Sequence, residues 1–350
     1  MHPILCLGRE SVKEDAMRFG WKDIRINVHC LVSCYCDIVK RRSGVDYRPF
    51  YFNVWDAAFD VTEEGNLTYY ANPASLDFYH LWVEKLFGLC PVDWYAALHS
   101  PEAGAERLSE LLEERPDYRF VMPHLDMFYL PDRDTRFDLK PFPHYVFVEL
   151  VSDDSGQLLM YDPDFRWEGL VPRNQVMGAF INNPDPGGWY IDAETVKEPS
   201  PTLIKAYFDA GFNRDANELT DRLREIVTAA DRNGSASSLT AAVKHLKVIV
   251  IRKYSYDYAL MYFHDHLELP AEHYEQWAQT IRDLVQLFTS VQFLCVKMAM
   301  TGQSALLAQI LAKLDEADRT ERLLKLEIER LMQEWCVKYG VQPEAAAGSL

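Results

Sequence analysis

Apolar side chains between Asn27 and Gly44 recur with the period of an α-helix. The recurring apolar positions are Leu31, Val32, Tyr35, Ile38 and Val39. This spacing predicts a helix with one face buried in the core. Arg41 and Arg42, followed by Gly44, are typical of a helix C-terminus. We therefore expect a buried helix with Cys30 in its first turn.

The rest of the N-terminal half alternates between helix and strand patterns. Helical periodicity covers residues 74–88 and 103–114, and strand-like aromatic and β-branched residues cover 45–70 and 118–122. Residues 144–151 (HYVFVELV) predict a strong strand, and a DDSG turn joins it to a second strand, QLLMYDP. These two strands predict a β-hairpin, and this half of the chain predicts an α+β fold.

The C-terminal half has an almost purely helical pattern. Prolines cluster near residues 198–202, where we predict a domain boundary. Helical periodicity then covers residues 203–212, 216–230, 238–254, 264–300 and 303–339. We predict an α+β domain over residues 1–200, a helical bundle over 201–342 and a disordered tail over 343–350.

Composition and charge narrow the classes of partner. Of the 350 residues, 48% are hydrophobic and 25% are charged, which is typical of a globular protein. The charge is unbalanced, because 36 Lys+Arg against 53 Asp+Glu give a net charge of −17. Such a chain repels nucleic acid and anionic lipid and favours cationic small molecules, although acidity also serves solubility alone. We predict no nucleic-acid partner.

Further features of the sequence bear on its compartment. No uninterrupted apolar run approaches about 18 residues, the length that a membrane span needs, so we predict no membrane partner. The N-terminal MHPILCLGRESVKED lacks the basic flank and long apolar core of a secretion signal. Seven cysteines without disulfide-framework spacing fit a reducing environment, and we expect a cytoplasmic protein.

Cys30 has the position of a reactive thiol. Unpaired backbone N–H groups and the positive end of the helix dipole converge on the first turn of a helix. Such a location is expected to lower the pKa of a thiol and to favour the nucleophilic thiolate. We therefore predict a cysteine nucleophile.

A base and a group that orients it are available in the predicted hairpin. His144 opens the first strand and Asp162 ends the second. Antiparallel strands joined by a short turn bring these two ends side by side, so the imidazole can meet the carboxylate. A cysteine on a helix, a histidine at a strand start and an aspartate after the next strand together follow the logic of papain-type enzymes. Cys30, His144 and Asp162 are therefore the predicted triad.

Other cysteines and histidines compete as metal ligands. Cys30, Cys34 and Cys36 form a C-x3-C-x-C pattern, but on a helix Cys36 points away from the other two. The HDH motif at residues 264–266, with His273 beyond it, could also bind a metal, although we expect these side chains to be solvated at a helix junction. We predict packing thiols, no metal and no bound cofactor.

Short motifs give the chain a resemblance to a known family. The HC pair at 29–30, the DMFYLPD segment at 126–132 before the HYVFV strand, and the YDP at 161–163 resemble the family of the butirosin-biosynthesis acyltransferase. By length and its helical second half, the chain is most similar to the aryl transferases of petrobactin siderophore biosynthesis. The motifs lie within residues 27–165, and the second half of the chain is similar only in its helical pattern.

The resemblance implies a papain-like (C39-peptidase-like) domain that moves an acyl group from the phosphopantetheine arm of a carrier protein to an amine. For the petrobactin enzymes it implies transfer of 3,4-dihydroxybenzoyl from an aryl carrier protein to spermidine, a polyamine. It matches Cys30, His144 and Asp162 to the triad, and Asp126 and Tyr129 to the segment before the histidine strand.

Several side chains are candidates for substrate contacts. Asn27 and His29 could assist the Cys30 backbone N–H in binding an oxyanion, since no glutamine precedes the cysteine as it does in the peptidase relatives. Asp126 could hold a substrate amine or cap a turn, and Tyr129 lies beside it. Three aromatic residues could wall an aryl pocket or simply pack in the core: Phe165, Trp167 and Trp189.

Two other functions use the same residues. A cysteine peptidase or amidase of papain-like fold would have the same triad, with water or a peptide amine in place of the polyamine. A non-catalytic module that binds a carrier protein would keep the fold without the chemistry. The helical half favours a transferase over a peptidase.

Overall fold

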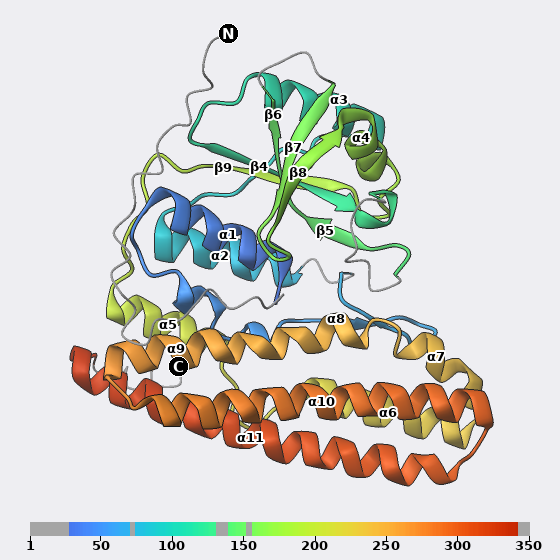
Figure 1. Cartoon of the computed structure of the whole chain (residues 1–350). Coiled ribbons are helices and arrows are strands. Elements are labelled where there is room, and N and C mark those ends of the chain that lie inside the picture. Colours follow the sequence, from blue (N-terminus) through green and yellow to red (C-terminus); the bar gives the residue numbers. More distant parts are fainter. Residues whose placement is uncertain (1–27, 71–73, 131–138, 152–155, 342–350) are drawn as a thin grey trace, which may run out of the picture.

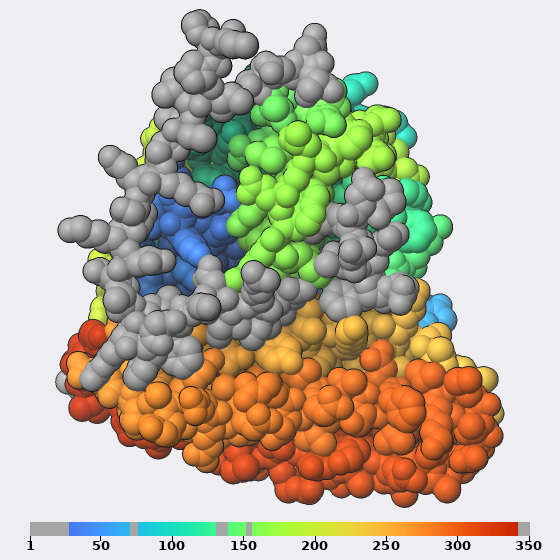
Figure 2. Space-filling view, in the orientation of Figure 1, coloured from blue at the N-terminus to red at the C-terminus, as the bar shows by residue number. Residues whose placement is uncertain are grey.

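The structure is a computed structural model with an α/β region followed by a helical region (Figure 1). The residues that it describes are 28–70, 74–130, 139–151 and 156–341. The predicted tail over 343–350 and the oxyanion candidate Asn27 lie outside these residues. Figure 2 shows the long helices, orange and red, as a continuous base beneath the strands, in green. The combination of helices and antiparallel sheets confirms the predicted α+β class.

The α/β region holds the first helices and all the strands. Its helices are α1 (Cys30–Arg42), α2 (Ala74–Phe87), α3 (Pro101–Glu113), α4 (Arg173–Ile181) and the 3-10 helices η1 (Arg48–Tyr51), η2 (Val54–Asp56) and η3 (Met127–Tyr129). Its strands are β1 (Asp60–Val61), β2 (Leu67–Thr68), β3 (Val92–Asp93), β4 (Arg119–Asp126), β5 (Pro143–Tyr145), β6 (Phe147–Leu150), β7 (Gln157–Asp162), β8 (Trp167–Pro172) and β9 (Gly187–Asp192).

Helix α1 is the buried helix that the apolar pattern predicts. Its apolar stripe is fully buried, and three basic residues occupy its last turn, where they complement the helix dipole. Its N-cap residue, His29, makes no side-chain capping hydrogen bond. The first turn of α1 therefore depends on an acceptor from elsewhere in the chain.

Two antiparallel sheets divide the strands of the α/β region. One has the order β3-β9-β4-β5, the other has the order β6-β7-β8, and β1 and β2 form a separate pair. The predicted strand over residues 144–151 is wrong as a single element, because it breaks at Val146. Its first part, β5, pairs with β4, whereas its second part, β6, pairs with β7. The chain thus passes from one sheet to the other immediately after His144.

The segment 45–70 is mostly not extended, which corrects the prediction of strands there. Pro49 begins η1, where a fixed φ and a missing N–H are tolerated. Phe50, Tyr51 and Phe52 are all buried, although they are consecutive, and a strand of period two would bury only alternate residues. The ring of Tyr51 stacks on Tyr258 of the helical region at 3.8 Å. Contacts with distant helices therefore override the local strand preference.

The helical region is an extended helical layer under the α/β region. Its elements are α5 (Pro201–Gly211), α6 (Glu218–Arg232), η4 (Ala236–Ser238), α7 (Leu239–Ala242), α8 (Leu246–Val250), η5 (Ile251–Tyr254), α9 (Ser255–Leu267), α10 (Ala271–Thr301) and α11 (Ala305–Tyr339). The predicted helix over 238–254 is wrong as a single element, since it is divided into four short helices. The predicted helix over 264–300 is divided between α9 and α10, because Glu268 adopts a left-handed conformation and Pro270 follows it.

Helix α10 is long and apolar enough to cross a membrane by length and composition alone. Its most apolar window has a mean hydropathy of 1.4. A core helix passes the same test, and α10 packs along α11 and against α7, α8 and α9. The contacts of α10 are those of a bundle helix.

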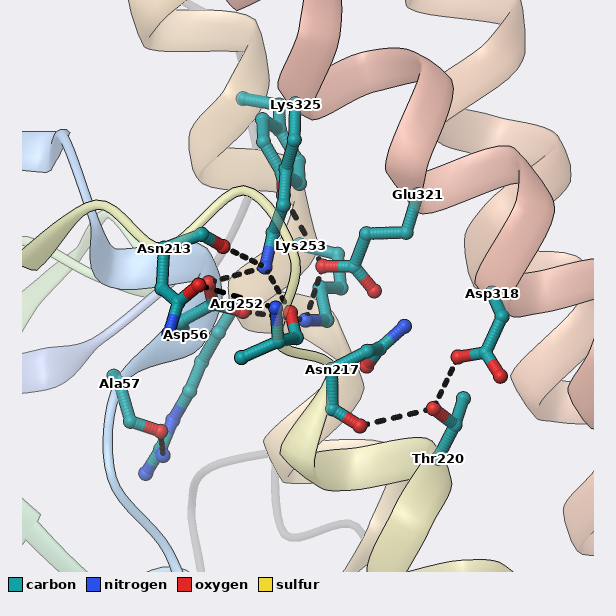
Figure 3. A network of polar contacts seen from close by, with 12 residues as sticks. Asp56, Ala57, Asn213, Asn217, Thr220, Arg252, Lys253, Asp318, Glu321 and Lys325 are labelled. Atoms are coloured by element: carbon teal, nitrogen blue, oxygen red, sulfur yellow. Dashed lines mark hydrogen bonds and ion pairs between the residues drawn. The ribbon is translucent and has the colours of Figure 1, made fainter.

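A hydrophobic core and a buried ion network join the two regions. One apolar cluster runs without a break from α1 to residues of α11. Beside it, Lys253 Nζ of η5 lies 2.5 Å from Glu321 Oε1 of α11 and 3.2 Å from an oxygen of Asp56 of η2 (Figure 3). Lys325 Nζ contacts the other oxygen of Asp56 at 2.6 Å. Opposite charges from both regions thus compensate each other in the interior.

Candidate active site

Asp164 holds the N-terminus of α1 in place. Its Oδ1 accepts hydrogen bonds from the backbone N–H groups of Val28 and His29 at 2.9 and 3.2 Å, and from Ser33 Oγ at 2.8 Å. This carboxylate, supplied from far along the chain, anchors the two residues that precede α1 and the side chain of Ser33 in its first turn. It thereby fixes the chain where Cys30 begins the helix.

His144 and Asp162 meet across the junction of the two sheets. His144 Nε2 lies 3.0 Å from Asp162 Oδ2, and both residues are buried. The other oxygen of Asp162 accepts the backbone N–H groups of Asp164 and Phe165, each at 3.1 Å. The carboxylate is therefore held from two sides, and it orients the imidazole through Nε2.

Cys30 is a further neighbour of the imidazole. Its charge and a side-chain interaction with the thiol both act on His144, and the two residues line the same cavity. Burial lowers the pKa of His144, but the charges of Asp162 and Cys30 outweigh burial and raise that pKa to about 10. His144 is therefore protonated near neutral pH. The structure thus brings together the three side chains that the sequence proposes as a triad.

Cys30 and His144 line a cavity of about 700 Å³, including solvent at its mouth, which we call the Cys30 cavity. Aromatic rings form much of its wall, and the ring of Phe165 lies 5.1 Å from that of His144. Three residues of the helical region complete the wall: Val248, Ile251 and Arg252. The wall combines aromatic and aliphatic side chains with polar ones, as the walls of ligand cavities commonly do.

Arg252 was missed by the sequence analysis. It is 4% exposed, and its guanidinium donates to the backbone oxygens of Ala57, Ala58 and Tyr69 at 2.8–3.1 Å. Burial lowers its pKa, although neighbouring groups such as Tyr79 and Cys30 oppose that effect. Its role is to tie the loop that carries Tyr69, a wall of the Cys30 cavity, to the helical region.

His29 lies in the Cys30 cavity but shows no settled polar role. Its Nδ1 is buried without a hydrogen-bond partner among the described residues. Burial, followed by the charges of Arg252 and His144, holds the pKa of His29 well below its usual value, so the ring is neutral. That His29 donates a hydrogen bond to an oxyanion stays a prediction.

The other predicted substrate contacts do not line the Cys30 cavity. Asp126 is 2% exposed, and its Oδ1 accepts the backbone N–H groups of Phe128 and Phe142 at 3.0 and 2.8 Å. Asp126 therefore caps η3, which agrees with the alternative that it caps a turn. Tyr129 lies on η3 with 36% of its surface exposed, and Trp167 opens β8 opposite Asp162. Of the three aromatic candidates, only Phe165 reaches this cavity.

The candidate metal ligands make protein contacts. Cys34 and Cys36 are buried, and burial raises the pKa of both thiols well above the usual value. His264 is fully buried, which corrects the expectation of a solvated cluster, and its Nε2 lies 2.8 Å from His273 Nδ1. His273 in turn contacts Glu327 at 2.6 Å. Across the described ranges, no three ligand-type side chains are arranged to hold a metal ion.

Comparison with known proteins identifies a family whose sequences match this chain. Residues 25–196 match the family described as the DUF6005 N-terminal domain, and residues 202–348 match the DUF6005 C-terminal domain. The chain is also 41% identical over 313 residues to a protein named petrobactin synthase from Bacillus anthracis. That similarity covers 89% of this chain and 95% of the relative.

Proposed function

The chain belongs to the family of petrobactin synthase from Bacillus anthracis, characterised by the two DUF6005 domains, and from this premise we propose that it is an acyltransferase of siderophore biosynthesis. The observation that carries the proposal is the contact of Cys30, His144 and Asp162 at one end of an apolar cavity. The acyl group is an aryl group, 3,4-dihydroxybenzoyl, and the acceptor is a polyamine, spermidine.

The first half-reaction transfers the acyl group to the enzyme. Cys30 Sγ attacks the carbonyl of a carrier-protein phosphopantetheine thioester, and the bond from that carbonyl to the carrier's sulfur breaks. The leaving sulfur takes the proton that His144 holds, which gives an acyl-enzyme and a free carrier thiol. One thioester replaces another, so the step needs no separate energy source. The backbone N–H of Cys30, in the first turn of α1, is placed to donate to the oxyanion.

The second half-reaction forms the amide. A neutral amine nitrogen attacks the acyl carbon, the bond from that carbon to Cys30 Sγ breaks, and the amine proton passes to His144. Primary ammonium groups have pKa values near that of Lys, about 10.4, so at neutral pH the reacting end must first lose one proton to solvent. The second proton, released as the amide forms, is the one that His144 accepts. Asp162 stabilises the imidazolium that results.

Fold and partners follow from the same premise. We propose a papain-like (C39-peptidase-like) domain over residues 1–200, because α1, which carries the cysteine, packs against β5, which carries the histidine. Residues 201–342 are the second domain. The donor is an aryl or acyl carrier protein, and the enzyme works in the cytoplasm without a bound cofactor.

Intact-mass measurement tests the nucleophile. Wild-type protein incubated with a 3,4-dihydroxybenzoyl thioester of phosphopantetheine is expected to gain the mass of one acyl group and to lose it when spermidine is added. Cys30→Ala is expected to gain no mass, and Cys34→Ala, which alters a buried thiol, is the matched control. An adduct that persists in Cys30→Ala would overturn the proposal. Hydrolysis of peptides without amine transfer would favour the peptidase instead.

A further inference from the structure

A second cavity adjoins the Cys30 cavity. It has a volume of about 860 Å³, again with solvent at its mouth, and we call it the Trp189 cavity. Both cavities are lined by the same five residues: Tyr70, Leu76, His124, Tyr145 and Asp185. Shared walls on this scale make the two cavities adjoining parts of one site, so a ligand held in the second can reach toward Cys30.

The charge of the Trp189 cavity is negative. Asp93 and Asp185 line it, and no Lys or Arg does so among the described residues. Burial holds the pKa of its histidine, His124, well below the usual value, so that ring adds no charge near neutral pH. In two other cavities cations accompany the acidic residues: the Cys30 cavity contains Arg252 beside Asp164 and Asp185, and a cavity beside η2 contains both Arg252 and Lys253 beside Asp56 and Glu218. The electrostatics of the Trp189 cavity thus favour a cation.

Aromatic faces add to that preference. Tyr95, Tyr145 and Trp189 line the Trp189 cavity, and the Tyr145 ring stacks on that of His124 at 4.2 Å. Aromatic faces attract ammonium groups, and their edges pack well against methylene chains. The cavity therefore matches both parts of an aliphatic amine.

The two carboxylates are held by the fold. Asp93 lies opposite Trp189 in the pairing of β3 with β9, and its Oδ1 accepts the backbone N–H groups of Tyr95 and Ala96 at 2.8 and 2.9 Å. The backbone oxygen of Asp185 contacts His124 Nδ1 at 2.8 Å. The side chain of Asp185 stays 59% exposed, and so is accessible to a ligand. Both acidic groups therefore have fixed positions at the wall of the cavity.

We infer that the Trp189 cavity is the acceptor subsite, in which Asp93 and Asp185 bind the ammonium groups of a linear polyamine while its reacting end extends past His124 toward Cys30. The inference rests on the proposed function for the identity of the reacting end. It assigns the acyl group to the apolar Cys30 cavity and the cationic chain to the acidic Trp189 cavity. Two substrates thus approach the thiol from different sides.

Binding of spermidine to the full-length chain tests the subsite without catalysis. In a Cys30→Ala background, calorimetry is expected to show that Asp93→Asn with Asp185→Asn weakens spermidine binding about tenfold or more, equivalent to about 1.4 kcal/mol. Asp192→Asn, at the end of strand β9 and paired with Arg119, lies outside the Trp189 cavity; it is the matched control and is expected to leave binding unchanged. An unchanged affinity in the double variant would overturn the inference.

A steric variant gives a second, independent test. Gly187 lines the Trp189 cavity, and a Cβ atom added there would have open space around it, with nothing within 4 Å. Gly187→Leu is expected to fill part of the cavity without displacing the fold, and so to weaken spermidine binding while all charges are kept. Normal spermidine affinity in a folded Gly187→Leu protein would contradict the inference.

Kinetics separate this inference from the proposed function. In Asp93→Asn, which alters a residue of the Trp189 cavity alone, acylation of Cys30 by the thioester is expected to keep its wild-type rate, and KM is expected to rise for spermidine but not for propylamine. Equal increases for the two amines would contradict a subsite for distal ammonium groups. If wild-type protein forms no acyl adduct, the proposed function fails, whereas the binding measurement still decides whether the cavity holds a polyamine.

Discussion

Two clusters of buried charge lie in different parts of this molecule and differ in how they are completed. In the ion network of Figure 3, Lys253 and Lys325 are surrounded by Asp56, Glu321 and backbone oxygens. In the candidate active site, Asp162 and His144 are equally buried, but the third group, Cys30, remains partly exposed to a cavity. Both clusters border cavities, but the charges of the first are paired with one another, so we call it closed, whereas the second includes a thiol at the wall of the Cys30 cavity, so we call it open.

The difference indicates what each cluster does. Both lysines of the network contact carboxylates within 3.2 Å, and the charges of Glu321 and Asp56 raise the pKa of Lys253 in spite of burial, so the network holds the two regions together. In the active site, two groups are held rigidly so that the third can react. The cluster that includes a nucleophilic side chain at a cavity wall thus indicates chemistry, and the cluster whose charges pair with one another indicates a structural role.

The largest effect is expected from Asp162→Asn, which breaks the open cluster. An amide cannot stabilise the imidazolium of His144, and it can favour the wrong tautomer, so the rate of amide formation should fall about a thousandfold. The midpoint of urea unfolding should change much less. Steady-state kinetics and unfolding curves check both expectations, with Asp192→Asn as a surface control. If the variant instead lost stability while the rate of amide formation per folded molecule stayed the same, the cluster would have a structural role.

Glu321→Gln breaks the closed cluster and should act in the opposite way. It leaves Lys253 buried without its nearest carboxylate, which should lower the free energy of unfolding by about 3 kcal/mol while the rate per folded molecule is kept. Urea unfolding measures the loss. The double variant Lys253→Met with Glu321→Leu leaves the pair of Asp56 and Lys325 intact, and it should recover most of the stability. Loss of activity at full stability would contradict a purely structural role.

The pH dependence of stability should reveal His144. Its pKa in the folded protein, about 10, exceeds the usual 6.5, so its contribution to stability is complete below about 6.5 and is lost as the pH rises through about 10. The difference in melting temperature between wild type and His144→Gln should therefore narrow from pH 7 to pH 10. Thermal unfolding at several pH values measures this difference. A constant difference would argue against a charged imidazole.

The smallest effect is expected at Asp126, a buried carboxylate outside the Cys30 cavity. Asp126→Ala removes the cap of η3 and should cost about 1 kcal/mol of stability without changing KM for either substrate. Tyr129→Phe, on the same turn, should change neither quantity. A selective rise in KM for the amine in Asp126→Ala would move Asp126 from the structural group to the substrate-binding one.

The fold could be predicted best from the sequence where an element is determined by the apolar pattern of neighbouring residues. Helices α1, α2, α3 and α11 follow from apolar spacing, because one face of each is buried over its whole length. The segment that forms η1 and η2 was mispredicted, since stacking of its rings on α9 determines its shape. The sequence did not show that residues 144–151 divide between two sheets. The break at Val146 depends on which strand pairs with each half of that segment.

For the candidate site, the sequence by itself determined that Cys30 begins a buried helix and that His144 and Asp162 flank a pair of strands. Only the tertiary structure decided that Asp164 anchors the residues before that helix, that Arg252 ties a cavity wall to the helical region, and that Asp93 and Asp185 share one cavity. The reason is distance along the chain. Periodicity reports neighbours a few residues apart, whereas Val28 and Asp164 are separated by 136 residues and meet only when both core and sheets have formed.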